Sequence, residues 1–187
     1  MTKYLSIKTI EISGFAAALE ALRLPFGKEC RSYYKGFCTS DSNTIHYRTD
    51  CNIDEKDLKL MSTLIKRGDE HSKAVRGIMV FALIDAPRYW WQEMVTYEVG
   101  VTKLTSNSTM HQECKGMSTE ELVAAKEAMP EGTRQKRVYA ISYQTLRRIY
   151  HQRHDHRLPH WQIFCEWMKT LPFANELIFV GIKDDEG

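Results

Sequence analysis

HSKAVRGIMVFALIDAPRYWWQEMVTYEVG, residues 71–100, contains the strongest structural signals of this chain. Its apolar run, residues 77–84, predicts a strand. Because the run is almost continuously apolar, we expect both faces of this strand to be buried. Residues 85–87 then turn the chain, and Pro87 suits the first turn of a helix that carries two tryptophans. A strand, a turn and a polar–aromatic helix in thirty residues form an arrangement that can hold a binding site.

On either side of this segment, alternation of polar and apolar residues, helical periodicity and capping signals predict further elements. Ser118 to Glu121 reads as a capping box, which predicts a helix that begins there. Residues 28–53 and 101–117 lack periodicity and are expected to be loops. The predicted strands cover residues 4–12 and 177–182, and the predicted helices cover residues 15–24, 54–67, 118–129, 140–153 and 160–171.

Composition excludes several classes of protein. The chain has 187 residues, of which 43% are hydrophobic and 27% charged, so we expect one globular domain, residues 1–187. A net charge of +2 gives no strong signal for nucleic-acid binding. No apolar run reaches the roughly 18 residues of a membrane span, and the N-terminus does not resemble a signal peptide. The cysteine count is five, without the spacing of a secreted disulfide scaffold, so we expect a cytoplasmic protein with reduced thiols.

A zinc site is one interpretation of the loop at residues 28–53. The loop contains three cysteines and a histidine, Cys30, Cys38, Cys51 and His46. These spacings do not form a paired Cys-x-x-Cys knuckle. A polar loop with semi-buried thiols is the favoured interpretation, and we predict no metal.

Several positions of the 71–100 segment match the spacing of one enzyme family. In that family a His-Ser pair precedes an apolar strand, an arginine opens the next helix, and the helix ends in His-Gln and then Arg-His-Arg. The corresponding positions here are His71-Ser72, Phe81, Leu83, Arg88, Gln92-Glu93, Thr96-Tyr97-Glu98 and Val99-Gly100. Through this pattern the chain resembles the flavin-dependent thymidylate synthases, or thymidylate synthase complementing proteins.

The resemblance extends over roughly residues 50–170. Ser108 matches the serine of the family's Ser-x-Arg-Tyr, and Leu146-Arg147 and Arg153 match a helix that ends in Leu-x-Arg. Residues 159–164 match the next helix in frame. The segment PRYWWQEMVTYEVGVTK, followed by STMH, also resembles uncharacterised proteins of bacterial viruses that belong loosely to this superfamily.

The resemblance implies a fold, an assembly and a chemistry. The fold is an α/β domain of the α+β type, with a mostly antiparallel sheet and flanking helices. The assembly is a homotetramer with sites between subunits. The implied ligands are FAD and a pyrimidine nucleotide such as dUMP, and in the reaction the reduced flavin supplies hydride while a folate supplies the carbon. The implied nucleotide-binding residues are Arg88, Gln92, Ser108, Arg147 and Arg153, and the implied cofactor-binding residues are His71, Ser72 and Tyr97.

The sequence also departs from the family at positions that contact phosphate and flavin. Arg-His-Arg is replaced by Thr96-Tyr97-Glu98, and the last helix arginine by Phe164. Loss of a cation opposite a phosphate removes a charge-assisted hydrogen bond, and Glu98 would repel the phosphate. The standard contacts to deoxyuridylate are therefore not all available to this chain.

Each candidate residue has an alternative interpretation. Arg88 opens a helix, where it either completes an anion site with the terminal N–H groups or forms a surface ion pair. His71 and Ser72 either contact a cofactor or form a turn. The basic stretch at residues 147–160 is a phosphate site, a solvated face with ion pairs, or a metal site.

Two functions of different classes follow. The first is a flavin-dependent methyl- or hydroxymethyltransferase that acts on a pyrimidine nucleotide. The second is a non-catalytic nucleotide binder on the same scaffold, such as a phage decoy that sequesters a signalling nucleotide. A structural relative without a ligand is a third possibility.

Overall fold

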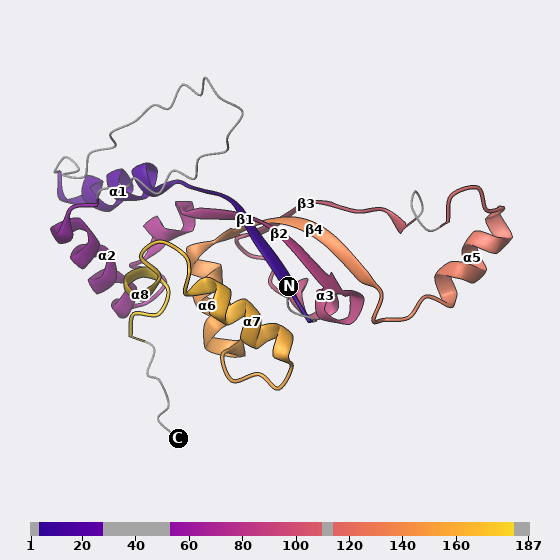
Figure 1. The fold of residues 1–187 in the computed structure, drawn as a ribbon. Coiled ribbons are helices and arrows are strands. Elements are labelled where there is room, and N and C mark those ends of the chain that lie inside the picture. Colours follow the sequence, from indigo (N-terminus) through magenta and orange to yellow (C-terminus); the bar gives the residue numbers. More distant parts are fainter. Residues whose placement is uncertain (1–3, 28–52, 110–113, 182–187) are drawn as a thin grey trace, which may run out of the picture.

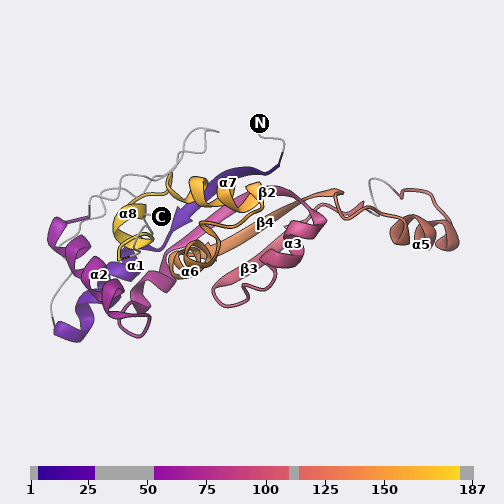
Figure 2. The ribbon, with the colours of Figure 1, turned by 90° about the horizontal axis from the view of Figure 1, so that it is seen from below.

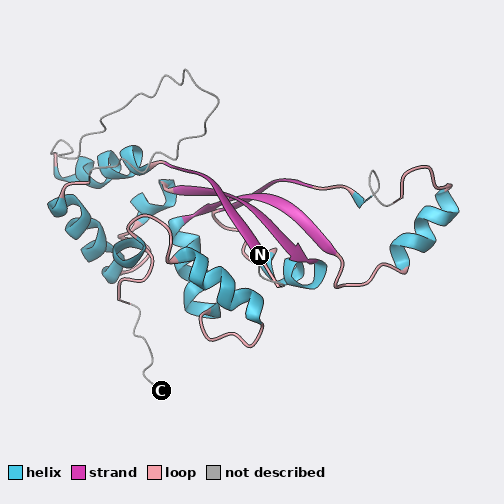
Figure 3. Ribbon diagram, viewed as in Figure 1, coloured by secondary structure: helices cyan, strands magenta, loops and turns pink. Residues whose placement is uncertain are grey.

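The computed structural model describes residues 4–27, 53–109 and 114–181 (Figure 1). Figure 3 distinguishes its helices, strands and loops. In chain order the elements are β1 (Ser6–Ser13), α1 (Phe15–Arg23), the 3-10 helix η1 (Leu24–Phe26), α2 (Glu55–Arg67), the 3-10 helix η2 (Lys73–Gly77), β2 (Met79–Pro87), α3 (Arg88–Met94), β3 (Val101–Ser106), α5 (Thr119–Glu127), β4 (Arg134–Ser142), α6 (Tyr143–Arg153), α7 (Pro159–Met168) and α8 (Ala174–Leu177).

The four strands form one antiparallel sheet in the order β1-β2-β4-β3. β2 lies inside the sheet, where Ile84 faces Ile7 of β1 and Arg137 of β4. Helices flank the sheet, and the predicted α+β class with an antiparallel sheet is therefore confirmed.

The prediction that β2 is buried on both faces is wrong. Val80, Ala82 and Ile84 are completely buried, whereas Phe81 and Leu83, which point the other way, are only partly buried. Helices α3, α6 and α7 lie along one face of the sheet (Figures 1 and 2). The apolar residues of the opposite face therefore have no helix of this group over them.

The core between the sheet and these helices is rich in aromatic side chains. Trp90 and Trp91 of α3 and Trp161 of α7 are at most 1% exposed. Trp90 packs against Trp161 with ring centroids 4.9 Å apart and against Phe164 with centroids 5.7 Å apart. The adjacent tryptophans of the 71–100 segment are thus both core residues.

The structure adds two strands that were missed, moves one predicted helix boundary and replaces one predicted strand with a helix. Residues 101–106 form the polar edge strand β3, and residues 134–142 form β4, which pairs with both β2 and β3. The helix predicted from residue 140 therefore begins at Tyr143. The strand predicted from residue 177 is wrong, because Ala174–Leu177 forms the short helix α8 and turns follow it.

An arm formed by the chain between β3 and β4 extends away from the other helices (Figures 1 and 2). Its helix α5 has no buried residue. The predicted capping box is confirmed at its start, because the Ser118 hydroxyl accepts from the Glu121 N–H at 3.3 Å and the Glu121 carboxylate accepts from the Ser118 N–H at 2.8 Å. The candidate zinc ligands, Cys30, Cys38, His46 and Cys51, lie outside the described residues.

Candidate functional site

Arg153, the last residue of α6, lies at the centre of a polar and aromatic cluster. Its Nε donates to the Tyr97 hydroxyl at 2.8 Å, and its Nη1 donates to Glu93 Oε2 at 2.9 Å. The same carboxylate oxygen accepts from Trp161 Nε1 at 2.8 Å. We call Glu93, Tyr97, Arg153, His156 and Trp161 the Arg153 cluster.

Three helices bring these side chains together. Glu93 is on α3, Tyr97 follows α3, Arg153 ends α6, and Trp161 lies on α7. The guanidinium carbon of Arg153 lies 4.7 Å from the Trp161 ring centroid and 5.7 Å from that of Tyr97, within the range of cation–π attraction. The cation thus lies over two aromatic rings that meet edge to face, with ring centroids 6.0 Å apart.

The carboxylate of Glu93 sets the electrostatics of this cluster. The side chains of Glu93 and Arg153 are 30% and 19% exposed, so their ion pair is only partly open to solvent. His156 Nε2 lies 3.7 Å from the same carboxylate oxygen. A ligand phosphate could bind Arg153 only by sharing or displacing Glu93, because both anions would use the same guanidinium.

Arg88 and Gln92 form a second group through Glu131, in the loop before β4. Gln92 Nε2 donates to Glu131 Oε2 at 3.0 Å, and Arg88 Nη2 lies 3.7 Å from Glu131 Oε1. The Arg88 backbone N–H donates to Thr133 O at 3.0 Å, so this N–H is not available to an anion. Arg88 thus forms an ion pair with Glu131, as one of its two interpretations expects. Because both side chains are substantially exposed to solvent, this ion pair contributes little stability.

Arg147, on α6, does not belong to either group and lies against residues 178–180. Its Nη1 donates to the carbonyls of Ile178 at 2.9 Å and Val180 at 2.6 Å. Burial lowers the pKa of Arg147, and nearby Asp69 opposes this. The pKa of His151 is also lowered, chiefly by burial and then by the charge of Arg147. In this structure Arg147 acts as an anchor of the chain end.

The remaining candidates do not join the Arg153 cluster. Ser72 is buried and its hydroxyl donates to Asp69 O at 3.4 Å, while the exposed His71 has Glu70 as its nearest acidic partner. Ser108 follows β3 at the start of the arm. The structure therefore brings Tyr97 to Arg153 and Arg88 to Gln92, but it does not gather all eight candidates within one subunit.

Two contributors to the cluster were not identified as such from the sequence. Trp161 falls in the helix predicted for residues 160–171 without a role assigned to it, and its indole N–H donates to Glu93. His156 was grouped with the other basic residues, although it faces the same carboxylate. Neither role has a local sequence signal, because each depends on how α3 packs against α7.

Candidate metal ligands and free thiols are both present in the described part of the chain. Within residues 4–27, 53–109 and 114–181, no three His, Cys, Asp or Glu side chains lie close enough to hold a metal ion. Cys114 and Cys165 are buried free thiols, and burial raises the pKa of Cys165 to about 12.

No helix among the described residues is long and apolar enough to cross a membrane.

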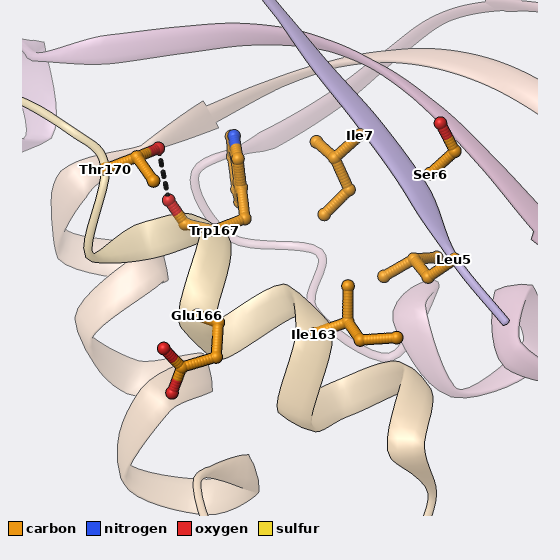
Figure 4. A pocket seen from close by; sticks show the side chains of 7 residues that line it. All are labelled: Leu5, Ser6, Ile7, Ile163, Glu166, Trp167 and Thr170. Carbon is orange, nitrogen blue, oxygen red and sulfur yellow. Dashed lines mark hydrogen bonds between the residues drawn. The ribbon is translucent and has the colours of Figure 1, made fainter. Parts of the chain in front are cut away.

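A cavity of about 420 Å³ lies between β1 and α7 (Figure 4). Its lining side chains are Leu5, Ser6, Ile7, Ile163, Glu166, Trp167 and Thr170. It contains no member of the cluster and no basic residue, so it does not suit a phosphate-bearing ligand.

Comparison with solved structures identifies the fold. The flavin-dependent thymidylate synthase ThyX from Helicobacter pylori, complexed with FAD and dUMP, aligns over 93% of this chain and 97% of its own, with a TM-score of 0.64 and 14% identity. The UMP/dUMP methylase PolB from Streptomyces cacaoi, bound with 5-Br dUMP, aligns over 92% of this chain and 91% of its own, with a TM-score of 0.59 and 12% identity. No protein-family model matches the sequence, and a search of curated proteins gives no match. At these identities the likeness shows a shared α+β fold.

The position of Arg147 leads to a stability prediction. We expect Arg147→Ala to lower the free energy of unfolding by about 1.5–3 kcal/mol, because two carbonyls of the chain end lose a charged donor. Urea unfolding measures the loss, and hydrogen exchange should show faster exchange after residue 177. Arg148→Ala, on the exposed side of the same helix, is the control and should change stability little. Equal effects of the two variants would contradict the anchoring role.

Proposed function

We propose that this chain binds a pyrimidine nucleotide. The observation that carries the proposal is the fold match over nearly the whole of both chains to two proteins whose structures contain dUMP or its 5-bromo derivative. A ligand of this class needs a cation for its phosphate and an aromatic face for its base. Arg153 supplies the cation, and the partly buried ring of Tyr97 beside it supplies the aromatic face.

Within this proposal the other predicted residues have definite roles. Arg153 contacts the phosphate in exchange for Glu93, and Tyr97 packs against the ligand. Gln92 and Arg88 bind the same ligand only if Glu131 releases them. Ser108 and the exposed His71 would reach it from a neighbouring subunit of the proposed homotetramer, whereas Arg147 and Ser72 would do so only after release of the backbone carbonyls that they bind.

Flavin-dependent transfer to the nucleotide is the finer form of the proposal. FAD is present in the Helicobacter pylori structure. The three residues expected to hold it here do not converge in the described subunit, since Ser72 donates to the backbone carbonyl of Asp69 while Tyr97 accepts from Arg153. Within one subunit these residues do not form one site for the cofactor, so in the proposed homotetramer they would meet only across a subunit interface, and we derive no catalytic step through FAD.

A non-catalytic nucleotide binder is the second candidate function. Loss of the family arginines at Thr96 and Phe164 favours it, because contacts that the family's reaction uses are missing from this sequence. Glu98, in place of a family arginine, adds negative charge two residues after Thr96. Both features lower the expected affinity for a substrate phosphate without preventing binding.

Measurements on the purified protein distinguish the transferase from the non-catalytic binder. The visible absorption spectrum is recorded, the protein is heat-denatured, and any released small molecule is identified by mass spectrometry, with the native mass measured alongside. A yellow tetramer that releases a flavin supports the transferase. A colourless protein that binds dUMP in a calorimetric titration supports the non-catalytic binder. A colourless protein that binds neither dUMP nor UMP would contradict the proposed function.

The role of Arg153 is tested in the same titration. We expect Arg153→Gln to weaken dUMP binding at least about tenfold, because a charge-assisted contact to the phosphate is lost. Arg153→Lys keeps the charge but not the planar fork, so its affinity should fall between those of the wild type and Arg153→Gln. Arg157→Gln, at an exposed position beyond α6, is the control for net charge. Unchanged affinity in Arg153→Gln, with an intact circular dichroism spectrum, would exclude this site.

A further inference from the structure

Gln144, in the first turn of α6, has a buried side-chain NH₂ group without a hydrogen-bond partner among the described residues. The residue is 5% exposed. Its Oε1 accepts from Arg76 Nε at 2.6 Å. A guanidinium carries donors only, so the oxygen of the amide must face Arg76 and the orientation of the amide is determined. Its Nε2 is then a donor that has no acceptor among the described residues.

Arg76 is the hydrogen-bond partner of Gln144 and the second residue of this candidate site. It lies on η2, which packs against α6, and its side chain is exposed to solvent. Only its Nε is used, by Gln144, and no carboxylate among the described residues lies within ion-pair distance of its guanidinium. The terminal nitrogens of Arg76, on a side chain exposed to solvent, therefore have no acceptor among the described residues, and its Nε joins this side chain to Gln144.

Gln144 Nε2 and the terminal nitrogens of Arg76 are hydrogen-bond donors for which the described residues offer no acceptor. Buried amide N–H groups are almost always hydrogen-bonded, so an unpartnered one beside an arginine points to an acceptor that binds from solution. An oxyanion has several acceptor oxygens and a charge opposite to that of Arg76. The N-terminal end of α6, an 11-residue helix, adds positive partial charge in the same region.

We propose that Gln144 and Arg76 bind an oxyanion, with Gln144 Nε2 and the terminal nitrogens of Arg76 as its donors. The bond between Gln144 Oε1 and Arg76 Nε holds the two side chains in position. The place is separate from the Arg153 cluster, because Gln144 and Arg153 are nine residues apart on α6, about 13 Å along the helix axis. The proposal therefore does not depend on nucleotide binding at Arg153.

Inorganic phosphate is the first probe, and Gln144→Glu is the decisive variant. The side-chain NH₂ signals of ¹⁵N-labelled protein are followed as phosphate replaces chloride at constant ionic strength. We expect the Gln144 signals to shift in a saturable manner. Gln144→Glu still accepts from Arg76 Nε but replaces the donor with an anionic oxygen. It should therefore remain folded and bind phosphate at least about tenfold more weakly, as judged from backbone signals.

Further variants separate this site from non-specific charge effects. Arg76→Gln should also bind phosphate at least about tenfold more weakly, whereas Arg148→Gln, which removes the same charge from an exposed position on α6, should keep the wild-type affinity. Arg153→Gln should keep it as well, which separates a failure here from a failure of the proposed function. Acetate and dUMP, titrated in the same way, show whether the oxyanion is a carboxylate, a free phosphate or a nucleotide phosphate. The proposal is overturned if no oxyanion shifts the Gln144 signals, or if Gln144→Glu binds phosphate like the wild type.

Discussion

Gly14→Ala is expected to lower the free energy of unfolding by about 2–5 kcal/mol. Gly14 connects β1 to α1 with a φ of +91°, and a left-handed conformation costs an alanine about 1–2 kcal/mol. An added Cβ would also lie 1.8 Å from the carbonyl oxygen of Gly77. The backbone must move to relieve this overlap, and overpacking of this kind adds about 1–3 kcal/mol.

Urea unfolding followed by circular dichroism measures this loss, and Gly27→Ala is the matched control. Gly27 also has a positive φ, +59°, but an added Cβ there would have no neighbour within 4 Å. Gly27→Ala should therefore lower the free energy of unfolding only by the strain of the left-handed conformation, about 1–2 kcal/mol. If the two variants lose equal stability, Gly14 and Gly77 do not make the close approach described here.

The parts of the fold that were predicted correctly are those with local chemical signals. β2 has a long apolar run, and Pro87 marks the start of α3. α2 begins with Asp54, whose side chain accepts from the Lys56 N–H, and ends in basic residues before Gly68. Such signals act within a few residues, so they can be recognised without knowledge of the tertiary structure.

The two missed strands are stabilised by pairing across the sheet. Four of the six residues of β3 are exposed, because this strand is at the edge of the sheet and is held by its ladder with β4. β4 begins with charged residues and becomes buried only from Tyr139 onward. Neither strand shows the simple alternation of a half-buried strand, and cross-strand pairing cannot be seen in one sequence.

Only part of the candidate site could be predicted for a similar reason. The family resemblance singled out Arg153 as a nucleotide-binding residue and Tyr97 as a cofactor-binding residue, and the structure places the two in contact. The same resemblance selected Arg147, whose guanidinium donates to the carbonyls of Ile178 and Val180. A sequence shows which residues could bind an anion, but the partners that already occupy them depend on tertiary packing.

Trp90→Ala is expected to cost about 3–5 kcal/mol of stability, the range for loss of a large aromatic side chain from a core. Trp90 is completely buried and contacts Trp91, Trp161 and Phe164 with centroid separations of 4.9, 4.9 and 5.7 Å. No single movement of the surrounding rings can fill the space, because they belong to two different helices. Denaturant unfolding followed by tryptophan fluorescence measures the loss.

Trp90→Phe is the comparison that separates packing from hydrogen bonding. Trp90 Nε1 is buried without a hydrogen-bond partner among the described residues, so its removal also relieves an unsatisfied donor. We therefore expect Trp90→Phe to lose much less stability than Trp90→Ala. Trp90 also supports Trp161, whose indole N–H holds Glu93 beside Arg153. If dUMP binds at the Arg153 cluster, Trp90→Ala should weaken that binding under conditions where it is still folded, while Trp90→Phe keeps it. Equal dUMP affinity in the two folded variants would mean that the aromatic core does not position the cluster.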